Sequence, residues 1–275
     1  MTLLVRSELL KIRTTSAWWW LGIGAFVMTA LALLVNALVA HEAFTGGALE
    51  GLDPEQAAAQ RDVVGQAANI YTSGQFFGLL FVMLIGILMV TNEFYHQTAT
   101  TTFLVTPHRT AVIMGKLATA TVVGFGFWLV TTVIDLITGA IFLQAEGYGT
   151  QLGEWGVTRA LLLNLLAYAI WTVFGVGFGT LITNQLGAVL TAVVLYLIGT
   201  QAATLVFFLL SEWLNNEAIL EWAVVVPSVA SSVMVSAAPE VPGNPQWWLG
   251  ALVLIAYALV TGAVGVLLTR RRDIS

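Results

Sequence analysis

Long uninterrupted runs of apolar residues, separated by polar segments, dominate the pattern along this chain. A membrane-spanning helix needs about 20 mostly apolar residues. In hydrocarbon every backbone amide must be hydrogen-bonded within its own segment, so continuous runs of this length predict helices. A β-barrel would instead need short segments that alternate between apolar and polar residues. The sequence therefore predicts an all-α membrane protein with six transmembrane helices, over residues 17–40, 74–91, 117–143, 158–182, 186–210 and 247–269.

Composition supports a membrane protein. Of the 275 residues, 58% are hydrophobic and only 9% are charged, whereas about 25% of the residues in a soluble domain are charged. The absence of cysteine excludes disulfides, thiol catalysis and cysteine-based metal sites. The three histidines are too scattered in the sequence to predict a metal site. No basic patch is large enough to hold a phosphate backbone, so nucleic-acid binding is disfavoured.

The placement of Lys and Arg predicts the orientation of the chain. With six spans, eight of the ten basic residues fall on one side of the membrane, and only Arg61 and Arg159 fall on the other. Eleven acidic residues lie on the Arg61 side. Because basic loops stay in the cytoplasm, we expect a multi-pass protein of the cell (plasma) membrane with both termini in the cytoplasm. Eight of the ten tryptophans fall at predicted span ends, which agrees with this topology.

Two segments on the predicted outer side have their own patterns. Residues 221–239 are apolar but are broken by Pro227, and a seventh span here would place the C-terminal arginines outside. We therefore predict an outer re-entrant hairpin between spans five and six, shielded by the outer ends of those spans. In the long outer loop 41–71, Asp53 as an N-cap and Pro54 at the first helical position predict a short outer helix.

The residues before the first span form a basic, amphipathic segment. Val5, Leu9 and Ile12 share one helical face, and Arg6 and Arg13 lie away from it. This spacing predicts an interfacial elbow helix within the first sixteen residues. The alternative is a basic flank that only fixes the topology.

The most informative segment is the polar, threonine-rich stretch 92–116, between spans two and three. Glu93 comes where span two should leave the membrane, and its carboxylate needs water or a basic partner; Arg109 and Lys116 are the candidates. Pro107 would end any helix before it. A folded, partly apolar cytoplasmic segment of this kind suits contact with another protein. The alternative is an ordinary intracellular loop.

Two local motifs resemble those of the type-2 ABC transporter permeases, especially the actinobacterial members. In the family, the cytoplasmic loop begins with a glutamate, an aromatic residue and a histidine. A run of threonines follows, and the loop ends with Pro-x-Arg and then a lysine at the next span. This chain supplies Glu93, Phe94, His96, Thr98, Thr101, Pro107, Arg109 and Lys116. The family's Glu-Leu-x-Lys-x-Arg-Thr entry is matched by Glu8, Leu9, Lys11, Arg13 and Thr14. Many members have Gly-Thr where this chain has Gln97-Thr98, so the turn after the glutamate departs from the family pattern.

The resemblance implies a division of labour between subunits. It implies one permease domain over residues 1–275, with an elbow helix (1–16), six spans, the outer hairpin, and a coupling helix within 92–116 that fits a groove on a cytoplasmic ABC ATPase subunit. Two permeases, the second a copy or a homologue, would join two ATPases in an exporter. The chain lacks a G-x-x-x-x-G-K-[ST] phosphate loop, since its one Gly-Lys pair is followed by Leu117. We therefore expect no enzyme activity and no cofactor in this chain, with ATP and Mg bound by the partner subunit.

One acidic residue, Asp135, lies clearly within a predicted span. A charge at this depth costs at least about 2.5–3.5 kcal/mol, so it needs a partner, water or a proton. We favour an ion pair with Arg159, at the outer start of span four. Lining a substrate path and proton coupling are the alternatives. Gly175 and Gly179, spaced as small-xxx-small, predict close helix packing.

These observations favour the transmembrane subunit of an ATP-driven ABC exporter. We expect a hydrophobic or amphipathic cargo, such as a drug, lipid or peptide, with multidrug efflux as one form, and membrane lipid as a further partner. The alternative is a motor-independent membrane channel or a lipid-scaffolding subunit. An intramembrane enzyme is disfavoured, because a lone Asp135 does not supply a nucleophile and a base. The sequence predicts neither the identity of the substrate nor whether the dimer is homomeric.

Overall fold

The computed structural model describes residues 2–46, 54–98, 109–237 and 245–271. Within these residues every regular element is helical, and six helical segments are long and apolar enough to cross a membrane. The all-α, six-span prediction is confirmed. The segments are Ala17–Thr45, Val63–Tyr95, Thr110–Ala145, Trp155–Leu181, Gln185–Leu214 and Trp247–Leu268.

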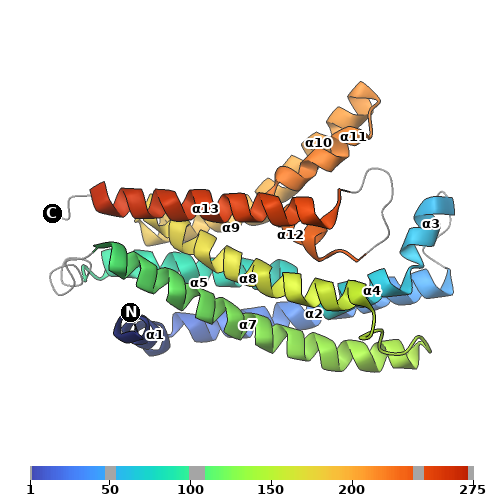
Figure 1. The fold of residues 1–275 in the computed structure, drawn as a ribbon, viewed down its shortest axis with the longest axis horizontal. Helices are drawn as coiled ribbons and strands as arrows, with labels where there is room; N and C mark the ends of the chain where they lie inside the picture. Colours follow the sequence, from blue (N-terminus) through green and yellow to red (C-terminus); the bar gives the residue numbers. More distant parts are fainter. Residues whose placement is uncertain (1, 47–53, 99–108, 238–244, 272–275) are drawn as a thin grey trace.

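The helices run mostly side by side along the long axis of the molecule (Figure 1). Several extend beyond the windows that the sequence predicted, because a helix keeps its hydrogen bonds after its side chains turn polar. In chain order they are α1 (Thr2–Thr14), α2 (Ala17–Thr45), α3 (Pro54–Gln60), α4 (Val63–Tyr71), α5 (Gln75–Tyr95), α7 (Arg109–Ala145), α8 (Trp155–Leu181), α9 (Gln185–Val194), a π-helical turn (Leu195–Gly199), α10 (Thr200–Leu214), α11 (Ala218–Glu221), a 3₁₀ turn (Trp222–Val225), α12 (Pro227–Val235) and α13 (Trp247–Arg271).

Helices α5 and α8 form the centre of the bundle, with α7 and α13 packed on α8. Small residues allow their close approach. A Cβ atom at Gly175 would collide with the carbonyl oxygen of Met83, and one at Gly179 would lie 2.9 Å from the carbonyl oxygen of Ile87. The predicted packing role of these two glycines is confirmed.

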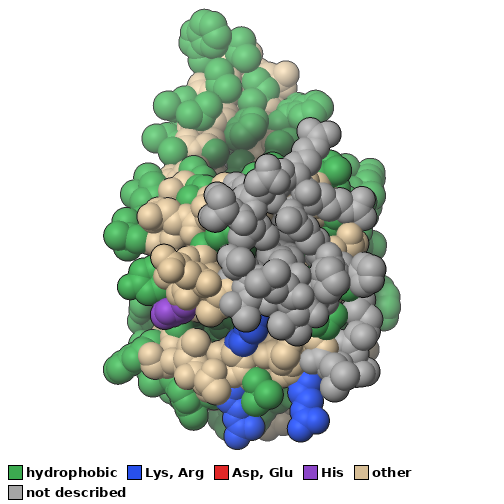
Figure 2. All heavy atoms as spheres, turned by 90° about the vertical axis from the view of Figure 1, so that its left-hand side faces the viewer, with side chains coloured by type: hydrophobic (Ala, Val, Ile, Leu, Met, Phe, Trp, Pro, Cys, Tyr) green, Lys and Arg blue, Asp and Glu red, His purple; other side chains and the backbone are tan. Residues whose placement is uncertain are grey.

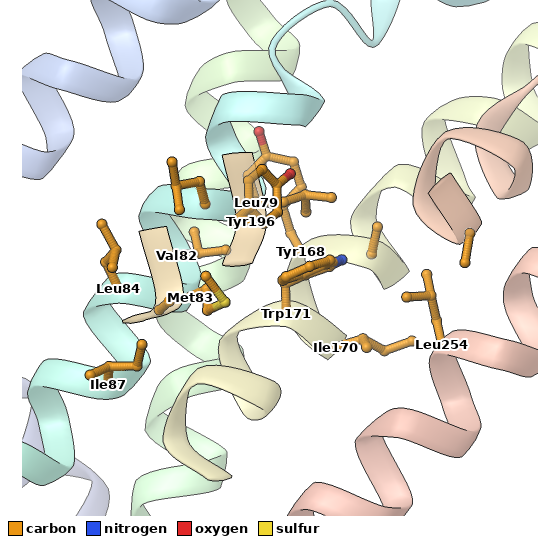
Figure 3. Close-up of a cluster of buried hydrophobic side chains, with 14 of the residues drawn as sticks. Leu79, Val82, Met83, Leu84, Ile87, Tyr168, Ile170, Trp171, Tyr196 and Leu254 are labelled. Carbon is orange, nitrogen blue, oxygen red and sulfur yellow. The ribbon is translucent and has the colours of Figure 1, made fainter. Parts of the chain in front are cut away.

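The main core lies where α5, α8 and the π-helical turn meet (Figure 3). Tyr196 and Trp171 are fully or nearly buried, and their rings lie 5.0 Å apart in an edge-to-face arrangement. Their polar tips are satisfied: the Tyr196 hydroxyl donates to the Phe76 carbonyl oxygen at 2.6 Å, and Trp171 Nε1 donates to Ser231 Oγ at 2.7 Å. Buried aromatic side chains of this kind add both apolar area and directional hydrogen bonds to the core.

The chain between the fifth and sixth spans turns back on itself. Helices Ala218–Val225 and Pro227–Val235 are bent by 107° relative to each other, and Pro227 occupies the first turn of α12, where a proline needs no amide partner. The second of these helices, α12, packs on α13 and α8. The bend agrees with the predicted hairpin 221–239. Its depth in a membrane stays a prediction, and the last two residues of that range lie outside the described part.

The predicted single helix of the 41–71 segment is two helices in the structure. One, α3, begins at Pro54 as expected, although Asp53 lies outside the described residues. The other, α4, is N-capped by Asp62, whose Oδ2 accepts a hydrogen bond from Gly65 N at 2.7 Å. Since α4 packs against α7 and α8, this part of the segment belongs to the core.

Helix α1 lies at the same end of the bundle as the C-terminal end of α13, and α3 and α12 lie toward the opposite end (Figure 1). An even number of crossings requires this arrangement. The side of the membrane that each end faces stays a prediction from the charge distribution.

Candidate functional site

Four charged side chains meet at the end of the bundle that carries α1. Lys11 Nζ lies 2.6 Å from Glu8 Oε1 and 2.6 Å from Glu93 Oε1. Lys116 Nζ lies 2.8 Å from Glu8 Oε2 and 2.9 Å from Glu93 Oε1. The same Lys116 ammonium donates to the carbonyl oxygen of Met89 at 3.0 Å. We call Glu8, Lys11, Glu93 and Lys116 the ion cluster.

The ion cluster is buried on three of its four members. Glu8, Glu93 and Lys116 are 5%, 6% and 2% exposed, whereas the Lys11 side chain is 45% exposed. Lys116 has three oxygen partners for its three N–H donors, so its charge is fully paired. Two carboxylates and two ammonium groups sum to zero charge, as a buried polar group in an apolar surrounding requires.

The ion cluster shifts the pKa of each of its two members on α1, Glu8 and Lys11. Burial alone would raise the pKa of Glu8, but the charge of Lys116 and the hydrogen bonds from Lys11 and Lys116 together lower it below its usual value of 4.5. Burial alone would lower the pKa of Lys11, but hydrogen bonds to Glu8 and Glu93 raise it above 10.5. Both groups are therefore charged across the physiological pH range.

The ion cluster joins three separate parts of the chain. Glu8 and Lys11 lie one turn apart on α1, Glu93 lies near the C-terminal end of α5, and Lys116 lies near the start of α7. Of the two partners predicted for Glu93, Lys116 is paired with it, and the side chain of Arg109 lies outside the described part of the chain. The participation of Glu8 and Lys11 was not predicted, although Glu8 and Glu93 are the lone acids of the two segments 1–16 and 92–116, which are otherwise basic or neutral. The occurrence of a single acidic residue in each of these segments was the sequence feature that could have indicated their participation.

The turn after Glu93 shows how the chain accommodates its departure from the family pattern. Gln97 has φ 55°, in the left-handed region. Gln97 N donates to the Phe94 carbonyl oxygen at 3.2 Å and Thr98 N to the Glu93 carbonyl oxygen at 2.9 Å. These two bonds form a Schellman motif, whose left-handed position favours glycine. Gln97 therefore occupies a backbone position at which glycine is the usual residue.

The other motif residues are only partly described. Phe94 packs with Ile12 of α1 on a small apolar cluster around Ile85 and Met89. His96 is exposed at the C-terminal end of α5. Three residues of the motif escape description: Thr101 and Pro107 lie outside the described residues, and of Arg109 only its place at the start of α7 is described. The predicted coupling helix therefore stays a prediction.

Helix α1 has the predicted amphipathic division. Val5, Leu9 and Ile12 are partly buried, whereas Arg6 and Arg13 are exposed. The buried face lies against α7, with which α1 makes most of its contacts. Its position at a membrane interface stays a prediction.

The predicted ion pair between Asp135 and Arg159 is wrong. Asp135 is 1% exposed, and its Oδ2 accepts a hydrogen bond from Gly74 N at 3.0 Å. Arg159 Nη2 donates to the Ser236 carbonyl oxygen at 2.8 Å, and its guanidinium carbon lies 5.0 Å from the centre of the Trp247 ring. The break between α4 and α5 leaves the Gly74 amide at a helix N-terminus, where a carboxylate is favoured. The arginine instead donates to the carbonyl oxygen of the residue that caps the C-terminal end of α12.

A family model described as ABC-2 family transporter protein matches residues 4–199, well over half of the chain. The chain belongs to the ABC-2 transporter family. The match includes all four members of the ion cluster and runs from α1 into the π-helical turn. A comparison with curated proteins gives no match. As an ABC-2 protein the chain is a membrane permease subunit of an ABC transporter, and membership implies association with an ABC ATPase subunit.

Proposed function

We propose that this ABC-2 permease exports a hydrophobic or amphipathic compound, using ATP hydrolysed by a separate cytoplasmic ATPase subunit. In this proposal a second permease, a copy or a homologue, completes the exporter. The observation that supports the mechanism is the ion cluster. It holds α1 to the two helix ends that flank residues 99–108, the segment proposed to contact the ATPase.

Through the ion cluster, a movement of the ATPase would displace the membrane helices directly. Separating one partner from a buried ion pair costs about 3–5 kcal/mol, because the other charge is left uncompensated. A displacement of the 99–108 segment would therefore move the ends of α5 and α7 together with α1, since shearing them apart breaks several pairs. Helix α5 packs along α8 at the centre of the bundle. The displacement would thus reach the core.

ATP would drive this change by favouring one of two conformations. It does so only to the extent that it binds the closed ATPase dimer more tightly than the open one. Glu93 and Lys116 are buried, so we assign them the positioning of the coupling segment and leave direct contact with the ATPase to exposed residues such as His96.

The test is co-purification of the permease with its ATPase subunit, followed by ATPase activity in proteoliposomes. We expect Glu93→Ala to lower both the retained ATPase and the permease-dependent ATP hydrolysis. Glu212→Gln removes an exposed carboxylate from α10 and should change neither. The proposal is wrong if Glu93→Ala and Lys116→Ala both behave like Glu212→Gln, or if Thr101 can be labelled from outside intact cells. Failure of any ATPase to co-purify would favour the motor-independent alternative.

A further inference from the structure

A cavity of about 230 Å³ lies beside the ion cluster, between α1, the start of α2 and the C-terminal half of α5. Its two ends differ in chemistry. One end is apolar and includes Leu21, Ile85 and Leu88. The other end is polar and includes Lys11 and His96, together with the carboxylates of Glu8 and Glu93 that pair with Lys11.

The change from apolar to polar follows the axis of α5. Ile85 and His96 are eleven positions apart, which in an α-helix corresponds to about 16 Å. His96 caps the C-terminal end of α5, which lies at the same end of the bundle as α1 (Figure 1), and Ile85 lies midway along α5. A ligand that fills the whole cavity must therefore be amphipathic, with its polar group at the α1 end of the protein. A free inorganic anion would leave the apolar half empty.

The accessible charge at the polar end is positive. The Lys11 side chain is 45% exposed, whereas Glu8 and Glu93 are 5% and 6% exposed. Lys11 uses two of its three N–H donors on these carboxylates, so one donor remains for a ligand. Figure 2 shows this end of the molecule: Lys and Arg side chains and a histidine are visible on it, and outside the grey area no acidic side chain is. An anionic head group is favoured here over a cationic one.

We propose that this cavity binds an anionic phospholipid from the membrane leaflet on the α1 side. The lipid phosphate accepts a hydrogen bond from Lys11, and Asn92 and His96 lie at the same polar end as further donors. One acyl chain begins along Leu21 and Leu88 and continues into the bilayer. Because Lys11 also belongs to the ion cluster, an occupied site adds a negative charge next to the contact between α1 and α5.

The experiment compares lipid retention by the purified full-length permease. The protein is exchanged into detergent with phosphatidylglycerol or phosphatidylcholine of the same acyl chains, and bound lipid is counted by native mass spectrometry. We expect phosphatidylglycerol to be retained about fivefold better, the effect of one accessible lysine on an anionic lipid. Inorganic phosphate at millimolar concentration should not displace it, because phosphate lacks the acyl chain.

Four variants locate the site. Lys11→Gln should abolish the preference for phosphatidylglycerol, and Leu88→Trp, which fills the apolar end, should reduce retention of both lipids. Arg6→Gln removes an exposed charge from the same helix but not from the cavity, and it should behave as wild type. Lys11→Arg keeps the positive charge and should keep the preference for phosphatidylglycerol over phosphatidylcholine. The proposal is overturned if the wild type retains both lipids equally, if Arg6→Gln acts like Lys11→Gln, if Leu88→Trp has no effect, or if phosphate displaces the lipid.

Discussion

Replacing Lys116 with methionine tests the ion cluster most directly. Methionine has a similar length and packs in apolar surroundings, so the substitution mainly removes the charge and its hydrogen bonds. Lys116 is 2% exposed and binds both Glu8 and Glu93, as well as the Met89 carbonyl oxygen. Without it the two buried carboxylates share the single charge of Lys11.

The expected loss follows from what remains after the substitution. Removing one partner of a buried ion pair costs about 3–5 kcal/mol, most of which is the penalty of the charge left behind. We therefore expect Lys116→Met to lower the free energy of unfolding by about 3–5 kcal/mol. The second substitution Glu8→Gln removes the charge left behind, so the double variant should lose at least about 0.5 kcal/mol less than the two single losses added together.

The assay is unfolding in mixed micelles, with added dodecyl sulfate as the denaturant and far-ultraviolet circular dichroism as the signal. Arg6→Met is the matched control, because Arg6 is exposed on α1 and outside the ion cluster; its effect should stay within about 0.5 kcal/mol. The reasoning is refuted if Lys116→Met is as mild as this control, or if the Glu8 and Lys116 substitutions are additive.

Three further predictions concern the same structure and use the same unfolding assay. Asp135→Leu leaves the Gly74 amide unpaired and should lose about 1–3 kcal/mol, whereas Asp135→Asn keeps an acceptor oxygen and should lose less; equal losses would contradict this. Gln97→Gly should stabilise by about 1 kcal/mol, because glycine adopts the left-handed conformation without strain; a loss would contradict the assigned turn. Stability should fall as the pH drops below 4.5 through the lowered pKa of Glu8, and should fall again above pH 10.5 as Lys11, whose pKa is raised, deprotonates; a Glu8→Gln variant should lack the acid limb that Glu8 contributes.

The spans were predictable from the sequence because hydrocarbon imposes a long, continuous apolar pattern. Their ends were less predictable. Helix α7 begins at Arg109, eight positions before the predicted start at residue 117, because the backbone hydrogen bonds of a helix do not depend on the apolarity of its side chains. The division of 41–71 into α3 and α4 was missed for a related reason: the burial of α4 depends on α7 and α8, which lie far away in the sequence.

The candidate site was predictable only where its residues flank one segment. Glu93 and Lys116 lie at the two ends of the same connection, so their pairing required no knowledge of the fold. Glu8 and Lys11 join them through the docking of α1 on α7, a tertiary contact that the sequence indicated only through the isolation of Glu8 in a basic segment. The predicted partner of Asp135 was wrong because the backbone amide of Gly74, and not a charged side chain, donates a hydrogen bond to its carboxylate.

The geometry of the ion cluster also explains why this apolar protein gathers four charges at one end and buries three of them. A buried ion pair is often no more stabilising than well-packed apolar residues of the same volume, so stability alone does not account for it. Its geometry is more selective than apolar packing: Glu8 receives one lysine on each carboxylate oxygen, and Glu93 Oε1 receives both lysines. A shift of α1 by a single residue would separate these pairs, whereas an apolar contact would tolerate it. The ion cluster thus fixes the register of α1 against α5 and α7, as the proposed transmission of movement from the ATPase would require.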